Sequence, residues 1–223
     1  MSPVWTPPCA LEKYLLNQVS MSQSEFEFRT WGGKRVGSGR HPKGEKAGVS
    51  HLSRPDLTGR HPVHVTLRLV YGLGYLRAHS RMRAIEGVLR EAKERFGLRI
   101  IHYSVQGIHL HLIVEAEDRR ALARGVQGLA IRLAKRLNRL VRRHGPVFAD
   151  RYHSHVLRSR REVANALRYV ARNYAHHARE NVPGNFVDPC SSARWLERAP
   201  PADAPVAPPV LWLLRNALKV PGS

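Results

Sequence analysis

The stretch Ser104-Val-Gln-Gly-Ile-His-Leu-His-Leu-Ile-Val-Glu115 decides the fold, because it connects two predicted strands through a tight turn. The residues from Leu98 to Val105 are rich in β-branched and aromatic side chains, which is typical of a strand. Gln106-Gly107 predicts the turn, and residues 108–114 predict the second strand. The sequence therefore predicts a β-hairpin at the centre of the fold.

His109 and His111 lie two residues apart in the second strand. Their side chains therefore leave the same face, separated by roughly 7 Å, whereas Leu110 points into the core. Both imidazoles can reach one cation, and imidazole suits manganese and zinc better than magnesium. Thirteen histidines in 223 residues predict on the order of one such pair by chance. A second pair, His153 and His155, also lies on a predicted strand, so spacing alone leaves both pairs open as ligands.

The flanking sequence predicts a mixed fold of strands and helices. In chain order we expect a strand at 64–69, a helix at 81–96, strands at 98–105 and 108–114, a helix at 118–143, a strand at 152–157 and a helix at 159–178. Asp118 predicts one helix start, and the capping box from Ser159 to Glu162 predicts another. This order favours an α+β fold, a ferredoxin-like antiparallel sheet with helices on one face.

Tyr169 and Asn173 are four residues apart in the last predicted helix and therefore share a helix face. A phenol that attacks a phosphodiester needs a nearby metal that withdraws charge from the phosphate oxygens. An amide oxygen on the same helix can supply a third metal ligand. The ordinary alternative is a tyrosine that covers the edge of the core, and Tyr152 and Tyr174 compete with Tyr169 as nucleophiles.

The order of these motifs resembles the HUH single-tyrosine transposases, and within them the IS200-like branch associated with repetitive extragenic palindromes. The segments that carry the resemblance are Ser104 to Glu115, Gly145-Pro-Val-Phe-Ala-Asp-Arg-Tyr-His153 and Ala166-Leu-Arg-Tyr-Val-Ala-Arg-Asn173. The likeness spans roughly residues 60–178. It implies that His153 and His155 are accessory residues rather than metal ligands.

The resemblance also implies the HUH endonuclease fold and a set of roles. His109 and His111 would be metal ligands, Asn173 the third metal-binding position and Tyr169 the nucleophile. The implied cofactor is a divalent metal, Mg²⁺ or Mn²⁺. The implied activity is that of a metal-dependent transposase, which nicks and joins single-stranded DNA at hairpin-associated sites through a 5′-phosphotyrosine intermediate.

The net charge of the chain points to a polyanionic partner. Lys and Arg number 37 against 17 Asp and Glu, a net charge of +20, and residues 63–178 alone carry +15. The excess therefore lies on the folded part of the chain, as expected of a surface that binds nucleic acid. The residues expected to contact DNA are Arg40, Lys43, Arg68, Arg132, Arg136 and Arg168. The expected partner is single-stranded and hairpin DNA, bound by a monomer or a homodimer.

Three regions are expected along the chain. Residues 1–60 form a basic, partly disordered arm that contains Gly and Pro, residues 61–178 the catalytic domain, and residues 179–223 a Pro-rich tail with a short apolar helix. Cys9 and Cys190 lie outside the expected core and predict neither a disulfide framework nor a zinc knuckle. No apolar run approaches a membrane span, so a cytoplasmic, nucleoid-associated location in a bacterium is expected.

Two other functions remain open at this point. A non-catalytic nucleic-acid-binding domain can share the ferredoxin-like sheet, but such domains display aromatic rings on the sheet, and here only Tyr103 is a candidate. A rolling-circle or relaxase-type nickase would share the histidine pair, but such chains usually carry two tyrosines or place the tyrosine elsewhere. Metal-dependent formation of a covalent DNA adduct would distinguish the first alternative from an enzyme.

Overall fold

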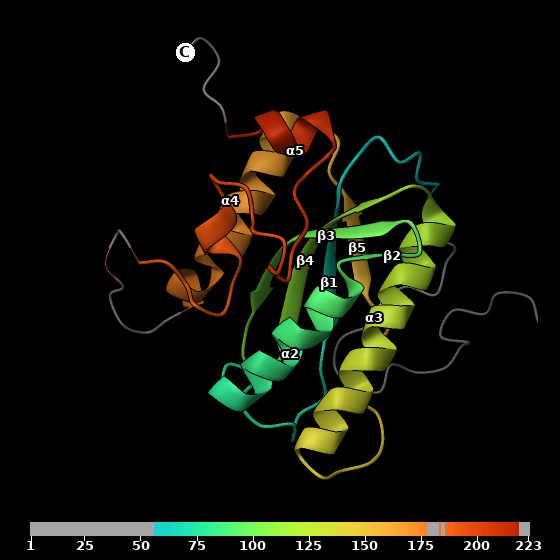
Figure 1. Cartoon of the computed structure of the whole chain (residues 1–223), viewed down its shortest axis with the longest axis vertical. Coiled ribbons are helices and arrows are strands. Elements are labelled where there is room, and N and C mark those ends of the chain that lie inside the picture. Colours follow the sequence, from blue (N-terminus) through green and yellow to red (C-terminus); the bar gives the residue numbers. More distant parts are fainter. Residues whose placement is uncertain (1–55, 178–182, 184–185, 219–223) are drawn as a thin grey trace, which may run out of the picture. The chain divides into compact units, whose positions relative to one another are not determined.

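A five-stranded antiparallel sheet forms the centre of the computed structural model, which describes residues 56–177, 183 and 186–218 (Figure 1). The strands are β1 (Val63–Arg68), β2 (Glu94–Arg95), β3 (Leu98–Val105), β4 (His109–Ala116) and β5 (His153–Val156), in the spatial order β2-β3-β4-β1-β5. The helices are α2 (His79–Ala92), α3 (Arg119–Leu140), α4 (Arg160–His177) and α5 (Trp212–Asn216), with a 3-10 turn at Ala193–Trp195. The expected α+β class with an antiparallel sheet is confirmed.

The helix expected at 81–96 ends earlier, at Ala92, because a short hairpin follows it. Arg95 of β2 pairs with Leu98 of β3, and the two residues between them, Phe96 and Gly97, have φ values of 59° and 72°. Positive φ at both central positions is the geometry of a tight hairpin turn. A strand as short as β2, with two residues, leaves no periodic pattern in the sequence, so this hairpin was not expected.

The start of α3 is as expected, and its end is not. The Asp118 carboxylate accepts a hydrogen bond from the Ala121 backbone N–H at 2.6 Å, which is an N-cap. The helix ends at Leu140 rather than near Arg143, and Arg142 just beyond it has a φ of 50°. A residue in this left-handed region commonly ends a helix.

Helices α2 and α3 cover one face of the sheet and pack against each other. On β4 the side chains that point to this face are Leu110, Leu112 and Val114, all of them buried. Tyr103 of β3 is also buried there and donates a hydrogen bond to Glu86 Oε1 at 2.6 Å. Its ring is therefore part of the core and does not offer the base-stacking surface of an RNA-binding sheet.

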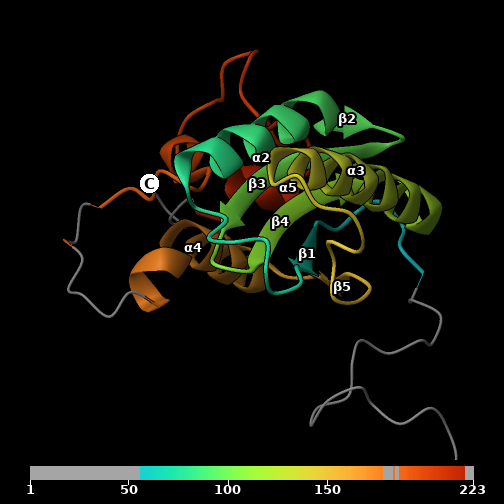
Figure 2. The same ribbon diagram turned by 90° about the horizontal axis from the view of Figure 1, so that it is seen from below.

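Helix α4 lies on the opposite face, so the expectation that all helices share one face is wrong (Figure 2). Ile101 and Ile113 of the sheet pack there against Val163, Leu167 and Val170 of α4. The residues of β3 and β4 are buried on both faces of the sheet, so each face needs a covering layer. Helix α4 covers the face that α2 and α3 leave open. This arrangement turns the α4 face of β4, which carries His109 and His111, toward Tyr169.

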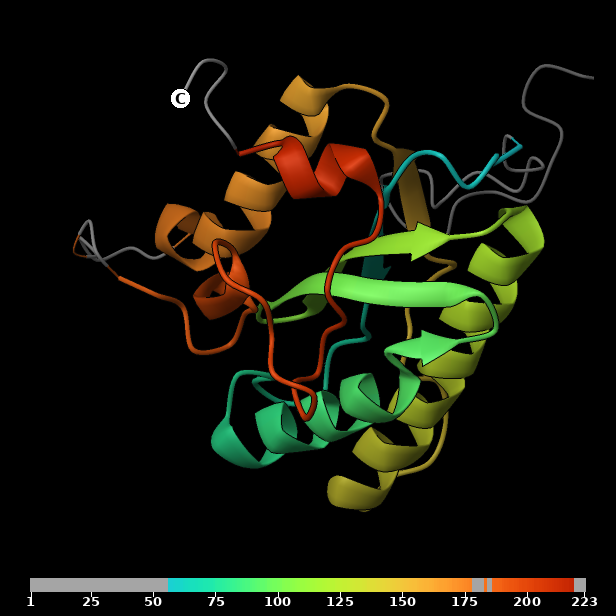
Figure 3. The same cartoon turned by 45° about the horizontal axis from the view of Figure 1, so that its top comes forward.

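The C-terminal segment runs beside β3 and covers the edge that the short β2 leaves open (Figure 3). The backbone N–H groups of Ser192 and Ala207 donate to the carbonyls of Tyr103 and Ile100, at 2.9 and 2.8 Å. Covering an edge strand in this way blocks pairing with other chains. The segment thus packs against the sheet, and Cys190 is buried, contrary to the expectation that it lies outside the core.

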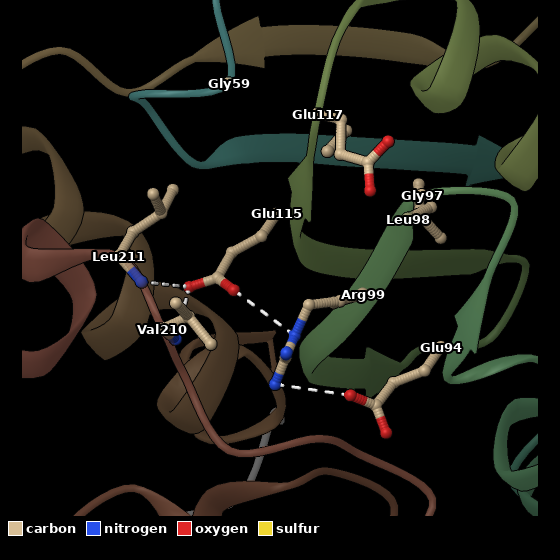
Figure 4. A pocket seen from close by; sticks show the side chains of 10 residues that line it. Gly59, Glu94, Gly97, Leu98, Arg99, Glu115, Glu117, Val210 and Leu211 are labelled. Carbon is tan, nitrogen blue, oxygen red and sulfur yellow. Dashed lines mark hydrogen bonds and ion pairs between the residues drawn. The ribbon is translucent and has the colours of Figure 1, made fainter.

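Glu115, at the far end of β4 from its histidines, fixes the same segment near α5 (Figure 4). Its Oε1 accepts two backbone hydrogen bonds, from Val210 at 2.8 Å and from Leu211 at 2.7 Å. Arg99 lies 3.5 Å from the other carboxylate oxygen. The cavity beside these groups has a volume of about 370 Å³, and Glu94, Arg99, Glu115 and Glu117 are its charged lining residues. Among the described residues, no helix is long and apolar enough to cross a membrane.

Candidate active site

Strand β4 places His109 and His111 on the face of the sheet that α4 covers. The two imidazole rings are nearly parallel, with centroids 6.1 Å apart and an interplanar angle of 27°. His111 is buried, and its Nδ1 lies 3.2 Å from the Thr66 hydroxyl, directly across from it on β1. A partner on Nδ1 orients the ring and makes Nε2 the natural ligand atom for a metal.

Helix α4 brings Tyr169 to these histidines. The Tyr169 ring stands at 90° to the His111 ring, with centroids 5.3 Å apart. The helix packs on the sheet through Val163, Leu167 and Val170, so Tyr169 falls at the edge of the buried stripe. Its side chain is 38% exposed, which leaves the phenol accessible to a large substrate. The expected meeting of the histidine pair and the tyrosine is therefore present in the structure.

Asn173 lies one turn further along α4 and is only 1% exposed. Neither its amide oxygen nor its amide nitrogen has a hydrogen-bond partner among the described residues. A buried amide without partners costs about 1–3 kcal/mol, so such a group calls for an explanation. The amide lines the same cavity as the histidine pair and Tyr169, a space of about 500 Å³.

The donor set of this cavity fits a divalent cation. It offers two imidazole nitrogens, from His109 and His111, and the unsatisfied amide of Asn173. Within the part of the chain that the structure describes, no three His, Cys, Asp or Glu residues gather in a way that could hold a metal. A third protein ligand here would therefore be an amide oxygen, and the metal-binding role of Asn173 stays a prediction.

His64 of β1 belongs to the same cluster, although the sequence analysis did not single it out. Its ring centroid lies 5.5 Å from that of His111 and 5.9 Å from that of Tyr169. Burial, followed by the charges of His153 and His155, lowers the pKa of His64 to about 4. The signal that could have found it is its position two residues before Thr66, on the same face of β1.

His153 and His155 of β5 lie beside this cluster, not within it. They pair with Thr66 and His64 of β1 and are exposed. Residues directly opposite each other on paired strands point to the same face. The second histidine pair is therefore adjacent to the site on the side away from β4, and its accessory role stays a prediction.

The residues expected to contact DNA fall in three places. Arg68 ends β1 opposite His109 and is exposed on the same face, and Arg168 is exposed on α4. Arg132 and Arg136 lie on α3, across the sheet from Tyr169. Arg40 and Lys43 lie outside the described residues. The structure therefore brings Arg68 to the site. DNA contacts of Arg132 and Arg136, on the face of the sheet opposite α4, stay a prediction.

Arg77, which the sequence did not reveal as important, ties α4 to the rest of the molecule. Its guanidinium donates two hydrogen bonds to the Asp188 carboxylate, at 2.7 and 2.9 Å, and both side chains are buried. It also donates to the Val105 carbonyl at 2.9 Å. The same group lies 3.9 Å above the Tyr174 ring, next to Asn173 in the chain. Arg77 thereby fixes the part of α4 that carries the candidate ligand.

Comparisons with known proteins place this chain by family and by fold. Residues 59–173 match a family model described as "Transposase IS200 like". The solved structure of a REP-associated tyrosine transposase bound to a REP hairpin aligns with a TM-score of 0.52 and 14% identity, over 65% of this chain and 83% of that one. A protein from Deinococcus radiodurans R1, provisionally described as a transposase, aligns with a TM-score of 0.38 and 16% identity, over 54% of this chain and 93% of that one. No curated protein matches. At these identities the first structure supports a shared fold.

Proposed function

This chain belongs to the IS200-like transposase family, and we propose that it cuts and rejoins single-stranded DNA with Tyr169 as the nucleophile. The observation that carries the proposal is the position of the Tyr169 ring, 5.3 Å from that of His111. A nucleophile and the groups that stabilise the phosphate must lie within a few ångströms of one reacting centre.

The proposed first step forms a bond between the Tyr169 oxygen and phosphorus and breaks the bond from phosphorus to the 3′ oxygen. The phenol loses its proton, and the departing 3′ oxygen gains one. The products are a 5′-phosphotyrosine and a free 3′-hydroxyl. Attack by a second 3′-hydroxyl then restores a phosphodiester and releases Tyr169, so that cutting and joining need no external energy source.

His109, His111 and Asn173 are the residues that would hold a divalent cation, Mg²⁺ or Mn²⁺. A cation held there would stabilise the negative charge on the phosphate oxygens. The protein's own contribution is orientation: Thr66 holds the His111 ring through its hydroxyl, and α4 presents Tyr169 and Asn173 together. The half-exposed phenol leaves room for a nucleic acid strand at the cavity mouth.

Hairpin-associated single strands are the proposed substrate. The structural neighbour is described as bound to a REP hairpin, and this chain carries a net charge of +15 over residues 63–178. Arg68 is exposed opposite His109, and this position supports the proposal that it contacts the backbone of a strand that enters the cavity. If such contacts to phosphate hold the DNA, affinity falls steeply as salt rises.

The proposal is tested by incubating the protein with end-labelled single-stranded hairpin DNA and Mn²⁺, followed by a denaturing gel. We expect a covalent protein–DNA band that needs the metal and is absent for Tyr169→Phe. Tyr174→Phe is the matched control, since Tyr174 lies on the same helix but stacks under Arg77. A band that survives Tyr169→Phe and disappears in Tyr174→Phe would transfer the nucleophile's role to Tyr174.

A further inference from the structure

The loop between β1 and α2 carries two tyrosines that the proposed chemistry does not use. Tyr71 is 75% exposed and Tyr75 is 56% exposed, among the largest exposures of any big apolar side chain in the described residues. Leu73 and Leu76 in the same loop are buried in the main core. The loop therefore anchors itself through its leucines while it holds two aromatic rings in solvent.

This loop begins at the candidate active site. It leaves β1 directly after Arg68, whose backbone pairs with that of His109. The Leu69 backbone N–H donates to the Ile108 carbonyl at 2.8 Å, which ties the start of the loop to the turn before His109. In Figure 1 it runs from β1 to the start of α2 at the lower end of the sheet. The loop therefore starts next to His109, which lines the same cavity as Tyr169.

The other end of the loop approaches α4. Tyr75 lies two residues before Arg77, and the Arg77 guanidinium stacks on the Tyr174 ring of α4. Tyr174 is the residue after Asn173, which lines the cavity. The exposed tyrosines are thus connected to the site from both sides, through β1 and through α4.

Two hydrogen bonds hold the backbone of the loop on either side of Gly74. Gly74 has a φ of 73°, and a Cβ built on it would lie 2.6 Å from Arg81 Nη2. Arg81 Nε donates to the Leu73 carbonyl at 2.8 Å, and the Ala78 backbone N–H donates to the Tyr75 carbonyl at 3.0 Å. Rings presented by a fixed loop lose little conformational entropy when they bind a ligand.

We propose that Tyr71 and Tyr75 form a stacking platform for the unpaired bases next to the phosphate that Tyr169 attacks. Proteins that hold single-stranded DNA combine cations along the backbone with aromatic rings on which bases stack. Arg68 supplies the cation and the loop supplies the rings. The choice of single-stranded DNA as the occupant rests on the proposed function, because a base can stack on a side chain only where it is unpaired.

The test measures equilibrium binding of short oligonucleotides by fluorescence anisotropy, in a Tyr169→Phe background that prevents chemistry. Tyr71→Ala and Tyr75→Ala should each weaken binding of a deoxyadenosine oligomer by about five-fold or more. Tyr71→Phe and Tyr75→Phe should keep the affinity, because the ring remains. An abasic oligomer of equal length, which keeps the phosphates and lacks the bases, should bind all variants alike.

Phe96→Ala is the matched control. Phe96 is another exposed aromatic residue, but it lies in the β2–β3 turn, at the end of the strands away from His109. Its removal should leave the affinity for the deoxyadenosine oligomer unchanged. Both tyrosines are exposed, so the thermal midpoints of the alanine variants should equal that of their parent, which excludes unfolding as the cause of weaker binding.

Three outcomes would overturn the platform: alanine variants that bind the deoxyadenosine oligomer as the parent does, an equal loss on the abasic oligomer, or an equal loss for Phe96→Ala. The proposed function is judged separately, by adduct formation in the protein that retains Tyr169. An adduct together with unchanged binding by the alanine variants would remove the platform and leave the chemistry. Ring-dependent binding without an adduct would keep the platform and remove the chemistry.

Discussion

The Tyr169 ring lies edge-on to the His111 ring, with centroids 5.3 Å apart, although the two residues come from a helix and a strand 58 positions apart in the chain. The contact exists because β4 is buried on both faces and α4 covers the face that carries His111. One packing arrangement therefore brings together a phenol, two imidazoles and a buried amide.

Asn173 is expected to serve function at the expense of stability. In Asn173→Leu the buried amide without partners is replaced by an apolar group of similar size, which should raise the free energy of unfolding by about 1–3 kcal/mol in the presence of a chelator. Metal-dependent adduct formation should be lost in the same variant. Urea unfolding and the denaturing gel measure the two effects, and a strongly destabilised variant would argue that the amide has a structural partner.

A bound metal should stabilise the folded protein through His109 and His111. At a Mn²⁺ concentration about a hundred times its Kd, binding to the folded state alone contributes roughly 2.7 kcal/mol, which corresponds to a rise of about 5–10 °C in Tm for a chain of this size. His109→Ala and His111→Ala should abolish the rise. His155→Ala should retain it, because His155 lies on β5 beside the cluster. Loss of the rise in His155→Ala alone would assign the metal to the second histidine pair.

Arg77 should be essential for the position of α4. Arg77→Ala leaves the Asp188 carboxylate buried without its cation and should cost about 3–5 kcal/mol. The double variant Arg77→Met, Asp188→Leu removes both charges and should be much less destabilised than Arg77→Ala. Denaturant unfolding of the three proteins measures the difference. Equal losses in both variants would mean that the other contacts of these side chains outweigh the ion pair, namely those of Arg77 with Tyr174 and Val105 and that of Asp188 with the Cys190 backbone N–H.

His102 should make the stability of the fold depend on pH. Burial lowers its pKa from 6.5 to about 4 in the folded protein. Below about pH 6.5 the unfolded chain gains a proton at this position that the folded protein does not, so the free energy of unfolding decreases until about pH 4, by roughly 3 kcal/mol in total. His102→Asn cannot titrate and should show a shallower decrease over this window. If the free energy of unfolding of the two proteins falls in parallel between pH 6.5 and pH 4, the lowered pKa of His102 is contradicted.

The sequence predicted the parts of the site that depend on local pattern. The i, i+2 spacing of His109 and His111 and the i, i+4 spacing of Tyr169 and Asn173 describe single elements, and both pairs line the cavity. The Asp118 cap was equally local, since it depends on residues three apart. Patterns of this kind need no knowledge of how elements pack.

The features that the sequence analysis missed depend on distant contacts. Arg77 and Asp188 are 111 residues apart, and no periodicity connects them. The position of α4 across the sheet from α2 and α3 depends on both faces of β3 and β4 being buried. The sequence does not indicate this burial, because the polar residues His102, His109 and His111 suggest a solvent-exposed face. His64 joined the site only because β1 lies between β4 and β5.

The most direct test of the central claim is to identify the amino acid that becomes linked to DNA. The protein is incubated with single-stranded hairpin DNA and Mn²⁺, the adduct is digested with protease and nuclease, and the modified peptide is sequenced by mass spectrometry. If Tyr169 is the nucleophile, the modified peptide carries a nucleotide attached through its 5′ phosphate to the Tyr169 oxygen. A nucleotide attached to any other residue, or a wild-type protein that cuts the DNA without a covalent link, would contradict it.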